Sequence, residues 1–232
     1  MNFQVSNTTQ NKNMLQVRDI FKSDRTLAWE FLTQFEFPWE ALPEIGKFLL
    51  TLMPQLDETK YYKLDNNVWI HKTATVAQTA FIGKSAIICQ GADIRHGAFI
   101  RENALVGAGA VVGNSTELKN AILFDEVQVP HFNYIGDSIL GYKSHMGAGA
   151  ITSNVKSDKT LVTVLCGDEK METGLKKFGA ILGDLVEVGC NSVLNPGSVV
   201  GASSSIYPLS FVRGFVPARS IYKKQGEVVT MR

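Results

Sequence analysis

The chain has 232 residues and a formal net charge of +1, which excludes the broad positive field that nucleic-acid and membrane-surface binders use. Its apolar runs are short, such as Phe48 to Met53, so no membrane span is expected. The first fifteen residues are polar and lack the apolar core of a secretory signal, so a cytoplasmic location is expected. Charged residues make up only 19% of the chain, and glycines number 20, a composition that indicates tightly stacked backbone.

Residues 1–67 are expected to form a helical cap region. Ser23 and Asp24 can cap a first helix, whose apolar face comprises Leu27, Phe31, Leu32 and Phe35. Pro38 can begin a second helix, which Pro54 ends and whose apolar face comprises Leu42, Ile45, Leu49 and Leu52. Because the repeats that follow predict a solenoid with an open end, we expect both helices to cover the first coil. A partner-binding role is the alternative.

A six-residue period organises residues 68–217. An apolar residue recurs at every sixth position: Ile70, Val76, Ile82, Ile88, Ile94, Ile100, Val106, Val112, Leu118 and Phe124. Alanine stands four residues after each of the first seven, and the same register returns at Leu182, Val188, Leu194, Val200, Ile206 and Val212. Six residues form one flat strand with a turn, and three such units close a triangular coil. We therefore predict an all-β solenoid, a parallel β-helix of hexapeptide repeats.

The period breaks in the middle of this solenoid. The apolar positions Ile135, Leu140, Met146 and Ile151 are five, six and five residues apart. An irregular insertion follows at about residues 153–178, and residues 218–232 are expected to form a C-terminal tail. Functional residues concentrate at such irregular segments, so we expect the site near them.

Two cations are expected to stack on one face of the solenoid. Arg101 and Lys119 are eighteen residues apart, which is one full coil. Cations held about one strand spacing apart repel each other unless an anion binds between them or solvent screens them. A phosphate suits such a pair, and two solvated surface charges are the alternative.

The cysteines and histidines do not form a metal-binding pattern. The three cysteines, Cys89, Cys166 and Cys190, show no C-x-x-C spacing, so neither a disulfide framework nor a zinc site is expected. The four histidines are His71, His96, His131 and His145, and the closest two are fourteen residues apart. No metal cofactor is expected.

A longer motif carries the resemblance to a known family. Residues 130–137 read Pro-His-Phe-Asn-Tyr-Ile-Gly-Asp, and Gly147-Ala148-Gly149 and Asn154 follow. This pattern resembles the acetyltransferase domain of bifunctional N-acetylglucosamine-1-phosphate uridylyltransferase/glucosamine-1-phosphate acetyltransferase, and the related C-terminal domains of sugar-1-phosphate nucleotidyltransferases. Residues 114–119 and 177–184 are similar to further stretches of these proteins. The resemblance implies a left-handed β-helix and a place in UDP-N-acetylglucosamine and nucleotide-sugar biosynthesis.

The resemblance also implies roles for particular residues. The sugar-phosphate cations fall on Arg101 and Lys119, the general base on His131 and a sugar contact on Tyr134. A histidine with a pKa near ~6.5 suits the removal of a proton from an amine that attacks a thioester. Acetyl-CoA is the implied co-substrate, bound in a groove of a homotrimer. We expect Ala148 and Gly149 to contact it, and Asn154 to contact either it or the sugar. Arg219, in the basic C-terminal segment, is expected to bind its phosphates, and a solvated tail is the alternative. Backbone N–H groups of residues 147–149 are expected to polarise the thioester oxygen.

The sequence departs from the family at several positions. His145 and Val155 replace residues that line the family's sugar site, and His145 is a change in ligand chemistry. The family's following lysine stays open between Lys156 and Lys159, and Lys159 is the one that we expect to contact the substrate. Residues 1–67 are too short for a nucleotidyltransferase half and contain no glycine-rich phosphate loop, so uridylyl transfer is not expected.

These observations favour an acetyl-CoA-dependent N-acetyltransferase that acts on a small-molecule amino-sugar phosphate similar to glucosamine 1-phosphate. Two alternatives remain. The first is a non-catalytic sugar-nucleotide-binding or scaffold module that partners a nucleotidyltransferase. The second is an O-acetyltransferase on another acceptor.

Overall fold

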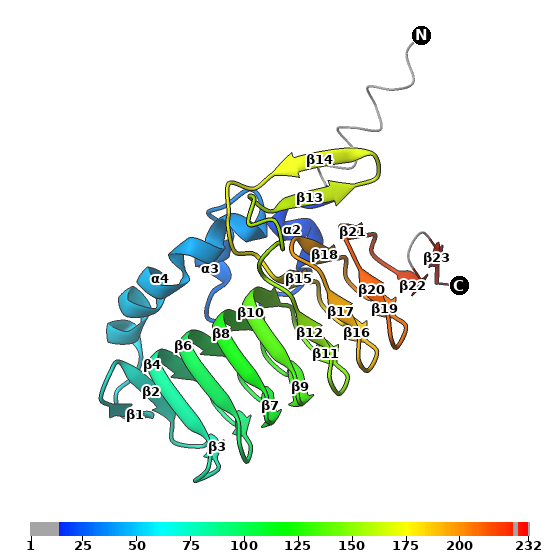
Figure 1. The fold of residues 1–232 in the computed structure, drawn as a ribbon. Helices are drawn as coiled ribbons and strands as arrows, with labels where there is room; N and C mark the ends of the chain where they lie inside the picture. The colour runs from blue at the N-terminus through cyan, green and yellow to red at the C-terminus, as the bar shows by residue number, and fades with distance from the viewer. Residues whose placement is uncertain (1–13, 225–226, 232) are drawn as a thin grey trace.

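The computed structural model describes residues 14–224 and 227–231. The chain is a left-handed parallel β-helix with three faces, so the predicted solenoid is confirmed. Figure 1 shows its coils side by side from β2 to β22, with the helices of the N-terminal segment along one side.

Two sheets make the three faces. Four long strands bend around a corner, so that their first residues form face 1 and their last residues form face 2: β4 (Phe81–Ile88), β6 (Phe99–Val106), β8 (Glu117–Leu123) and β10 (Tyr134–Leu140). Face 1 continues through β12 (Ile151–Thr152), β17 (Val193–Leu194) and β20 (Phe211–Val212). Face 2 also contains β2 (Val68–His71), β15 (Ala180–Leu182), β18 (Ser198–Val200) and β21 (Phe215–Val216).

Face 3 is the second sheet, and its strands are short. They are β3 (Thr75–Val76), β5 (Asp93–Ile94), β7 (Val111–Asn114), β9 (Gln128–His131), β11 (His145–Met146), β16 (Glu187–Val188), β19 (Ser205–Ile206) and β22 (Ser220–Lys224). Each of these strands pairs in parallel with its neighbours in this series. Each face therefore presents one column of outward side chains along the solenoid axis.

The N-terminal segment lies along face 2 and does not cover the end of the solenoid. Its helical pieces are α2 (Val17–Ile20), α3 (Trp29–Leu32), η1 (Pro38–Glu44), α4 (Ile45–Leu52) and η2 (Met53–Gln55). Helix α4 packs on β4, β6 and β8, and η1 packs on β10. The expected end cap is wrong in this respect, because β1 (Tyr61–Leu64) pairs antiparallel with β2 and covers the first open edge.

The physical reason is that face 2 is apolar on its outer side as well. Side chains alternate between the two sides of a strand, and the outward positions of six central strands of face 2 are fully buried: Ile87, Leu105, Ile122, Ile139, Ile181 and Val199. At the two ends of this column, Trp69 is 7% exposed and Phe215 is partly buried. Leaving this column in water would cost free energy in proportion to its apolar area. The apolar faces of the N-terminal helices therefore pack against the side of the solenoid and not against its end.

The repeat register changes at Arg101, earlier than the sequence indicated. Ile100 pairs with Leu118, eighteen residues on, but Glu102 pairs with Lys119, seventeen residues on. Arg101 is the extra residue of a β-bulge, a feature that redirects a side chain. The prediction that Arg101 stacks directly on Lys119 is therefore wrong.

Two segments depart from the regular coil. The insertion between β12 and β15 carries an antiparallel hairpin of β13 (Thr163–Cys166) and β14 (Glu169–Glu172), which runs across the later coils in Figure 1. The expected C-terminal tail instead continues face 3, because β22 pairs in parallel with β19 and β23 (Glu227–Thr230) turns back against it. No helix among the described residues is both long and apolar enough to cross a membrane.

The contact between α4 and face 2 predicts a stability difference between neighbouring leucines. Leu49 is 0% exposed and Leu50 is 48% exposed. Replacing Leu49 with alanine should lower the free energy of unfolding by about 2–4 kcal/mol, because it leaves a cavity in the core. The matched control, Leu50→Ala, should change it by less than about 1 kcal/mol. Urea denaturation of both variants measures this, and equal losses would contradict the packing.

Candidate active site

A buried ion pair lies at the corner where face 1 turns into face 2. The Lys119 Nζ lies 3.1 Å from Oδ1 and 3.4 Å from Oδ2 of Asp137. The side chains are 15% and 6% exposed, respectively. A charged group with so little solvent exposure needs both a counter-charge and hydrogen bonds. The position of the Lys119 ammonium is therefore fixed by Asp137.

Two amide side chains complete the hydrogen bonding of this carboxylate. Asn120 Nδ2 donates to Oδ1 over 3.0 Å, and Asn154 Nδ2 donates to Oδ2. The Asn120 amide also donates to the backbone carbonyl of Leu42 in η1 over 3.0 Å. The corner thus joins three coils and the N-terminal segment through a single carboxylate.

Arg101 forms a second ion pair beside the first. Its Nη1 lies 2.9 Å from Oε1 of Glu117, and this hydrogen bond raises the pKa of the Arg101 guanidinium. Both side chains are partly exposed, so solvent screens the pair. Several N–H groups of the guanidinium remain for a ligand, because arginine carries five donors and one is used here.

Tyr134 lies between the two ion pairs. Its hydroxyl accepts a hydrogen bond from Asn154 Nδ2 over 3.2 Å. Burial raises the pKa of the Tyr134 phenol, and the charges of Asp137 and Glu117 raise it further. The phenol stays neutral at physiological pH, so it can donate a hydrogen bond to a ligand.

The charges at this corner balance, which the sequence did not indicate. Each expected phosphate cation has its own carboxylate: Glu117 for Arg101 and Asp137 for Lys119. The expected pair of mutually repelling cations is therefore wrong. An anionic ligand would bind through the free donors of these cations or displace a carboxylate from one of them.

His131 lies at the next corner, where face 3 turns into face 1. It ends β9 and its side chain is exposed. Asn133, which is buried, accepts the His131 backbone N–H over 3.0 Å and donates to the carbonyls of Gly147 and Ala150. Asn133 therefore holds the histidine and the Gly-Ala-Gly turn in fixed positions relative to each other.

Only one backbone donor of this turn remains for a substrate. The N–H of Gly147 donates to Val188, and the N–H of Gly149 donates to the carbonyl of His131 over 3.0 Å. Within the described part of the chain, the N–H of Ala148 has no such partner. Of the three backbone N–H groups of this turn, that of Ala148 is therefore the one available to donate to the thioester oxygen.

Three of the predicted site residues lie elsewhere in the single chain. The ring of His145 is on face 3, with Nδ1 2.8 Å from Oε2 of Glu187. Arg219 is at the corner between faces 2 and 3, directly before β22, and Lys159 is exposed in the insertion. Face 3 and its corner with face 2 point away from the corner of Tyr134, so one chain does not bring the side chains of His145 and Arg219 to it.

The structure adds residues that sequence reasoning did not single out. Asp137 is the last residue of the motif at residues 130–137, and the sequence alone indicated no role for it. Lys177 precedes Phe178, whose backbone N–H donates to the carbonyl of Asn154 over 3.0 Å. The insertion thus leaves the solenoid and returns to it at this corner, and Lys177 lies in the chain directly before the returning residue.

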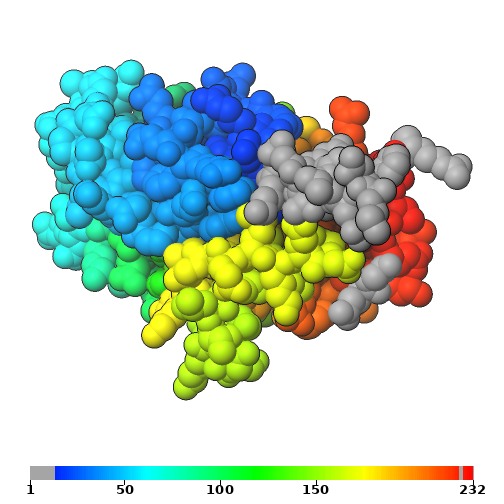
Figure 2. Space-filling model, turned by 90° about the horizontal axis from the view of Figure 1, so that it is seen from above, coloured from blue at the N-terminus to red at the C-terminus, as the bar shows by residue number. Residues whose placement is uncertain are grey.

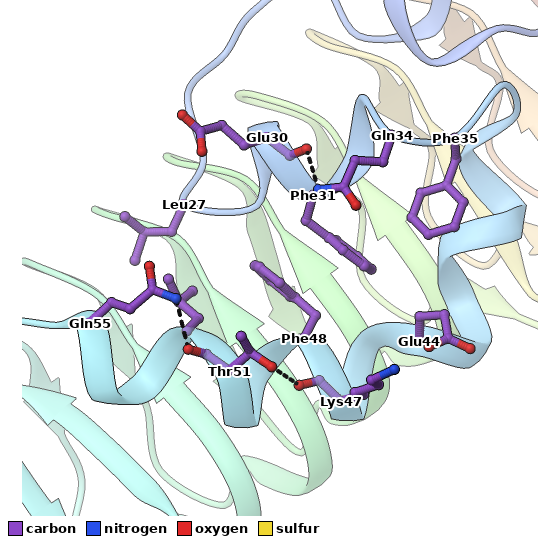
Figure 3. Close-up of a pocket in the computed structure, with 11 residues that line it drawn as sticks. Leu27, Glu30, Phe31, Gln34, Phe35, Glu44, Lys47, Phe48, Thr51 and Gln55 are labelled. Carbon is purple, nitrogen blue, oxygen red and sulfur yellow. Dashed lines mark hydrogen bonds between the residues drawn. The ribbon is translucent and has the colours of Figure 1, made fainter.

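Other possible sites are less suited to this chemistry. A groove of about 390 Å³ lies between α3 and α4 (Figure 3), where the rings of Phe31 and Phe48 stack. Its lining comes from residues 27–55 alone, so it contains none of the predicted site residues. No group of three or more His, Cys, Asp or Glu side chains among the described residues could hold a metal ion.

Comparison with known proteins identifies the family of this chain. The family model described as the GMPPB C-terminal domain matches residues 84–222. The chain belongs to this family. As a member of the GMPPB C-terminal domain family, it contains both corners described above within the matched residues.

Individual relatives match over part of their length. The "Bifunctional protein GlmU" of Methanococcus aeolicus is 35% identical over 116 residues, which cover 50% of this chain and 28% of that protein. The "Bifunctional sugar-1-phosphate nucleotidylyltransferase/acetyltransferase" of Sulfurisphaera tokodaii is 31% identical over 109 residues, 47% of this chain and 27% of that protein. The chain thus spans less than a third of these relatives. The acetyltransferase domain of PglB from Neisseria gonorrhoeae, in complex with acetyl coenzyme A, aligns over 71% of this chain and 57% of that one, with 15% identity and a TM-score of 0.33.

Asp137→Asn tests the buried ion pair. Asp137 has a φ of 47°, and asparagine tolerates this left-handed conformation, so the substitution mainly removes charge. It leaves the Lys119 ammonium buried without a counter-charge and should lower the free energy of unfolding by about 3 kcal/mol. The control is Glu102→Gln, which breaks the exposed pair with Lys84 and should cost less than about 1 kcal/mol. Equal effects in urea denaturation would contradict the special position of Asp137.

Proposed function

We propose that the protein transfers the acetyl group of acetyl-CoA to the amine of an amino-sugar phosphate. The observation that carries the proposal is the convergence of Arg101, Lys119, Tyr134 and Asn154 at one corner, with His131 at the next. Membership of the GMPPB C-terminal domain family supports it, as does the acetyltransferase name of the Sulfurisphaera tokodaii relative.

In this proposal the corner of Tyr134, between faces 1 and 2, binds the sugar, and we call it the sugar corner. Free N–H groups of Arg101 and Lys119 bind the phosphate, which arginine holds well because its planar donors match phosphate oxygens. Tyr134 and the Asn154 amide bind sugar hydroxyls. Lys177, which enters this corner with the end of the insertion, adds a further cation.

The acetyl transfer needs one proton acceptor and one oxygen contact. The amine nitrogen attacks the thioester carbonyl, the C–N bond forms, the C–S bond breaks, and coenzyme A leaves as a thiol. His131 accepts the proton that the amine loses and passes it to the departing thiolate, which regenerates the base. The N–H of Ala148 donates to the thioester oxygen as negative charge develops on it. No metal is required for this step.

We propose a homotrimer with acetyl-CoA bound between neighbouring chains. Face 2 is covered by the N-terminal segment, whereas face 1 exposes Phe81 and Phe99, which are 58% and 40% exposed and pack edge to face at 5.5 Å. Exposed aromatic pairs of this kind favour a protein partner. Association of chains would also bring residues of separate faces, such as His145 and Arg219, toward a neighbour's sugar site.

A non-catalytic sugar-nucleotide-binding module is the second candidate. Two observations favour it: the charge-balanced corner, and the His145 ring held by Glu187 on face 3. Such a module would bind a sugar nucleotide without releasing thiol from acetyl-CoA. The acetyltransferase proposal expects acetyl-CoA to raise the melting temperature, and a melting temperature unchanged by saturating acetyl-CoA would favour the module.

His131→Ala tests the proposed base. With acetyl-CoA and glucosamine 1-phosphate as probes, thiol release should fall by about a hundredfold or more in kcat. His96→Ala is the matched control, because His96 lies at the same corner two coils earlier and contacts Thr79. It should leave kcat unchanged. Full activity in His131→Ala would remove this residue from the mechanism.

Arg101→Gln tests the phosphate contact. The KM for glucosamine 1-phosphate should rise about tenfold, the typical effect of losing one charge-assisted hydrogen bond. The KM for unphosphorylated glucosamine should not change, because that acceptor has no phosphate to bind. A similar rise for both acceptors would instead indicate general damage to the corner.

A further inference from the structure

The hairpin β13–β14 forms one wall of a bay beside the proposed site. Gly197 and Gly214 both have a φ of 81°, and a Cβ added to them would lie 2.7 Å from the Thr163 carbonyl and 2.6 Å from the Leu165 carbonyl. Strand β13 therefore packs directly on the backbone of two coils, and no larger residue fits there. Its position over the later coils, visible in Figure 1, is set by this close approach.

Two cavities of about 280 and 320 Å³ open against this hairpin. Both are lined by Lys156, Thr163 and Arg213. We call the two cavities together the hairpin bay. The first also contains Ser153 and Val155, the neighbours of Asn154, so the bay adjoins the sugar corner. In Figure 2 the yellow insertion lies between the blue N-terminal segment and the red C-terminal coils.

The hairpin bay carries an excess of positive charge. Its cations are Lys156, Lys170 and Arg213, and its acids are Asp158 and Glu172. Asp158 accepts hydrogen bonds from Thr160 and lies 3.7 Å from the Lys156 ammonium. Arg213 and Lys170 form no ion pair in the described part of the chain. Cations gathered around a cavity favour an anion that can accept several N–H groups.

The bay also suits the size and shape of a nucleotide. Tyr134 on β10 and Phe211 on β20 lie on the same face and are separated by three strand spacings, or about 14 Å. A monophosphate at the sugar corner does not span this distance. Phe211 lines the bay and is 50% exposed, so its ring is available to stack on a base.

We propose that the hairpin bay binds the pyrophosphate of a nucleotide through Lys156, Lys170 and Arg213. Two sources of this group are possible, and both rest on the proposed function: the nucleotide part of coenzyme A, or an acceptor in which the amino-sugar phosphate is extended to a nucleoside-diphosphate amino sugar. The binding itself does not depend on acetyl transfer. It is therefore measured without turnover, so that its failure and the failure of the proposed function are distinct.

The test is calorimetric titration of the full chain at low ionic strength with inorganic pyrophosphate and with uridine diphosphate. The double variant Lys170→Gln/Arg213→Gln should weaken both affinities at least about tenfold, since two charge-assisted contacts are lost. The matched control is Lys176→Gln, an exposed cation of the same insertion that does not line the bay. It should leave both affinities unchanged.

A second arm identifies the source of the pyrophosphate. Displacement of uridine diphosphate by coenzyme A assigns the bay to the cofactor, and simultaneous binding of both assigns it to the acceptor. Either assignment also requires that the double variant binds uridine diphosphate more weakly than the unmodified chain does. Equal affinities in the double variant and the unmodified chain, or no binding of either probe by the unmodified chain, would overturn the proposal.

Discussion

The carboxylate of Asp137 is the interaction on which the site depends. It accepts hydrogen bonds from Lys119 and Asn120 of the preceding coil and from Asn154 of the following coil, so that three successive coils meet at this carboxylate. Asn120 extends the network to Leu42 in the N-terminal segment. A buried carboxylate with three donor groups around its two oxygens is costly to disturb. The same network that joins the coils therefore also fixes the atoms proposed to bind a sugar phosphate.

The apolar outer side of face 2 explains why the site lies where it does. The N-terminal segment covers that face, and β1 pairs with the first open edge. The surfaces that remain accessible to ligands and neighbouring chains are face 1, face 3 and the corners that border these two faces. The sugar corner, the histidine corner and the hairpin bay all border face 1. The surface proposed for chemistry is thus the surface that packing leaves open.

The sequence predicted the fold well because the six-residue period reflects stacking geometry directly. Ile82, Ile88 and Ile94 recur in the register that the coils require. The site was predicted less completely. Counting residues could not locate the bulge at Arg101, because one extra residue in a strand leaves no mark on the apolar pattern until the next coil. The paired carboxylates Glu117 and Asp137 were also missed as partners, since a spacing of sixteen to eighteen residues does not say which side chains meet. The sequence could not indicate the packing on the outer side of face 2, because an apolar residue such as Ile87 can lie on a buried face or on an exposed one.

The most direct test of this account is a crystal structure of the protein with glucosamine 1-phosphate. The account predicts a phosphate within hydrogen-bond distance of Arg101 and Lys119, the sugar ring against Tyr134 and Asn154, and the amine facing His131 of the same chain or of a neighbour. A sugar bound elsewhere, with Lys119 still held only by Asp137, would contradict it.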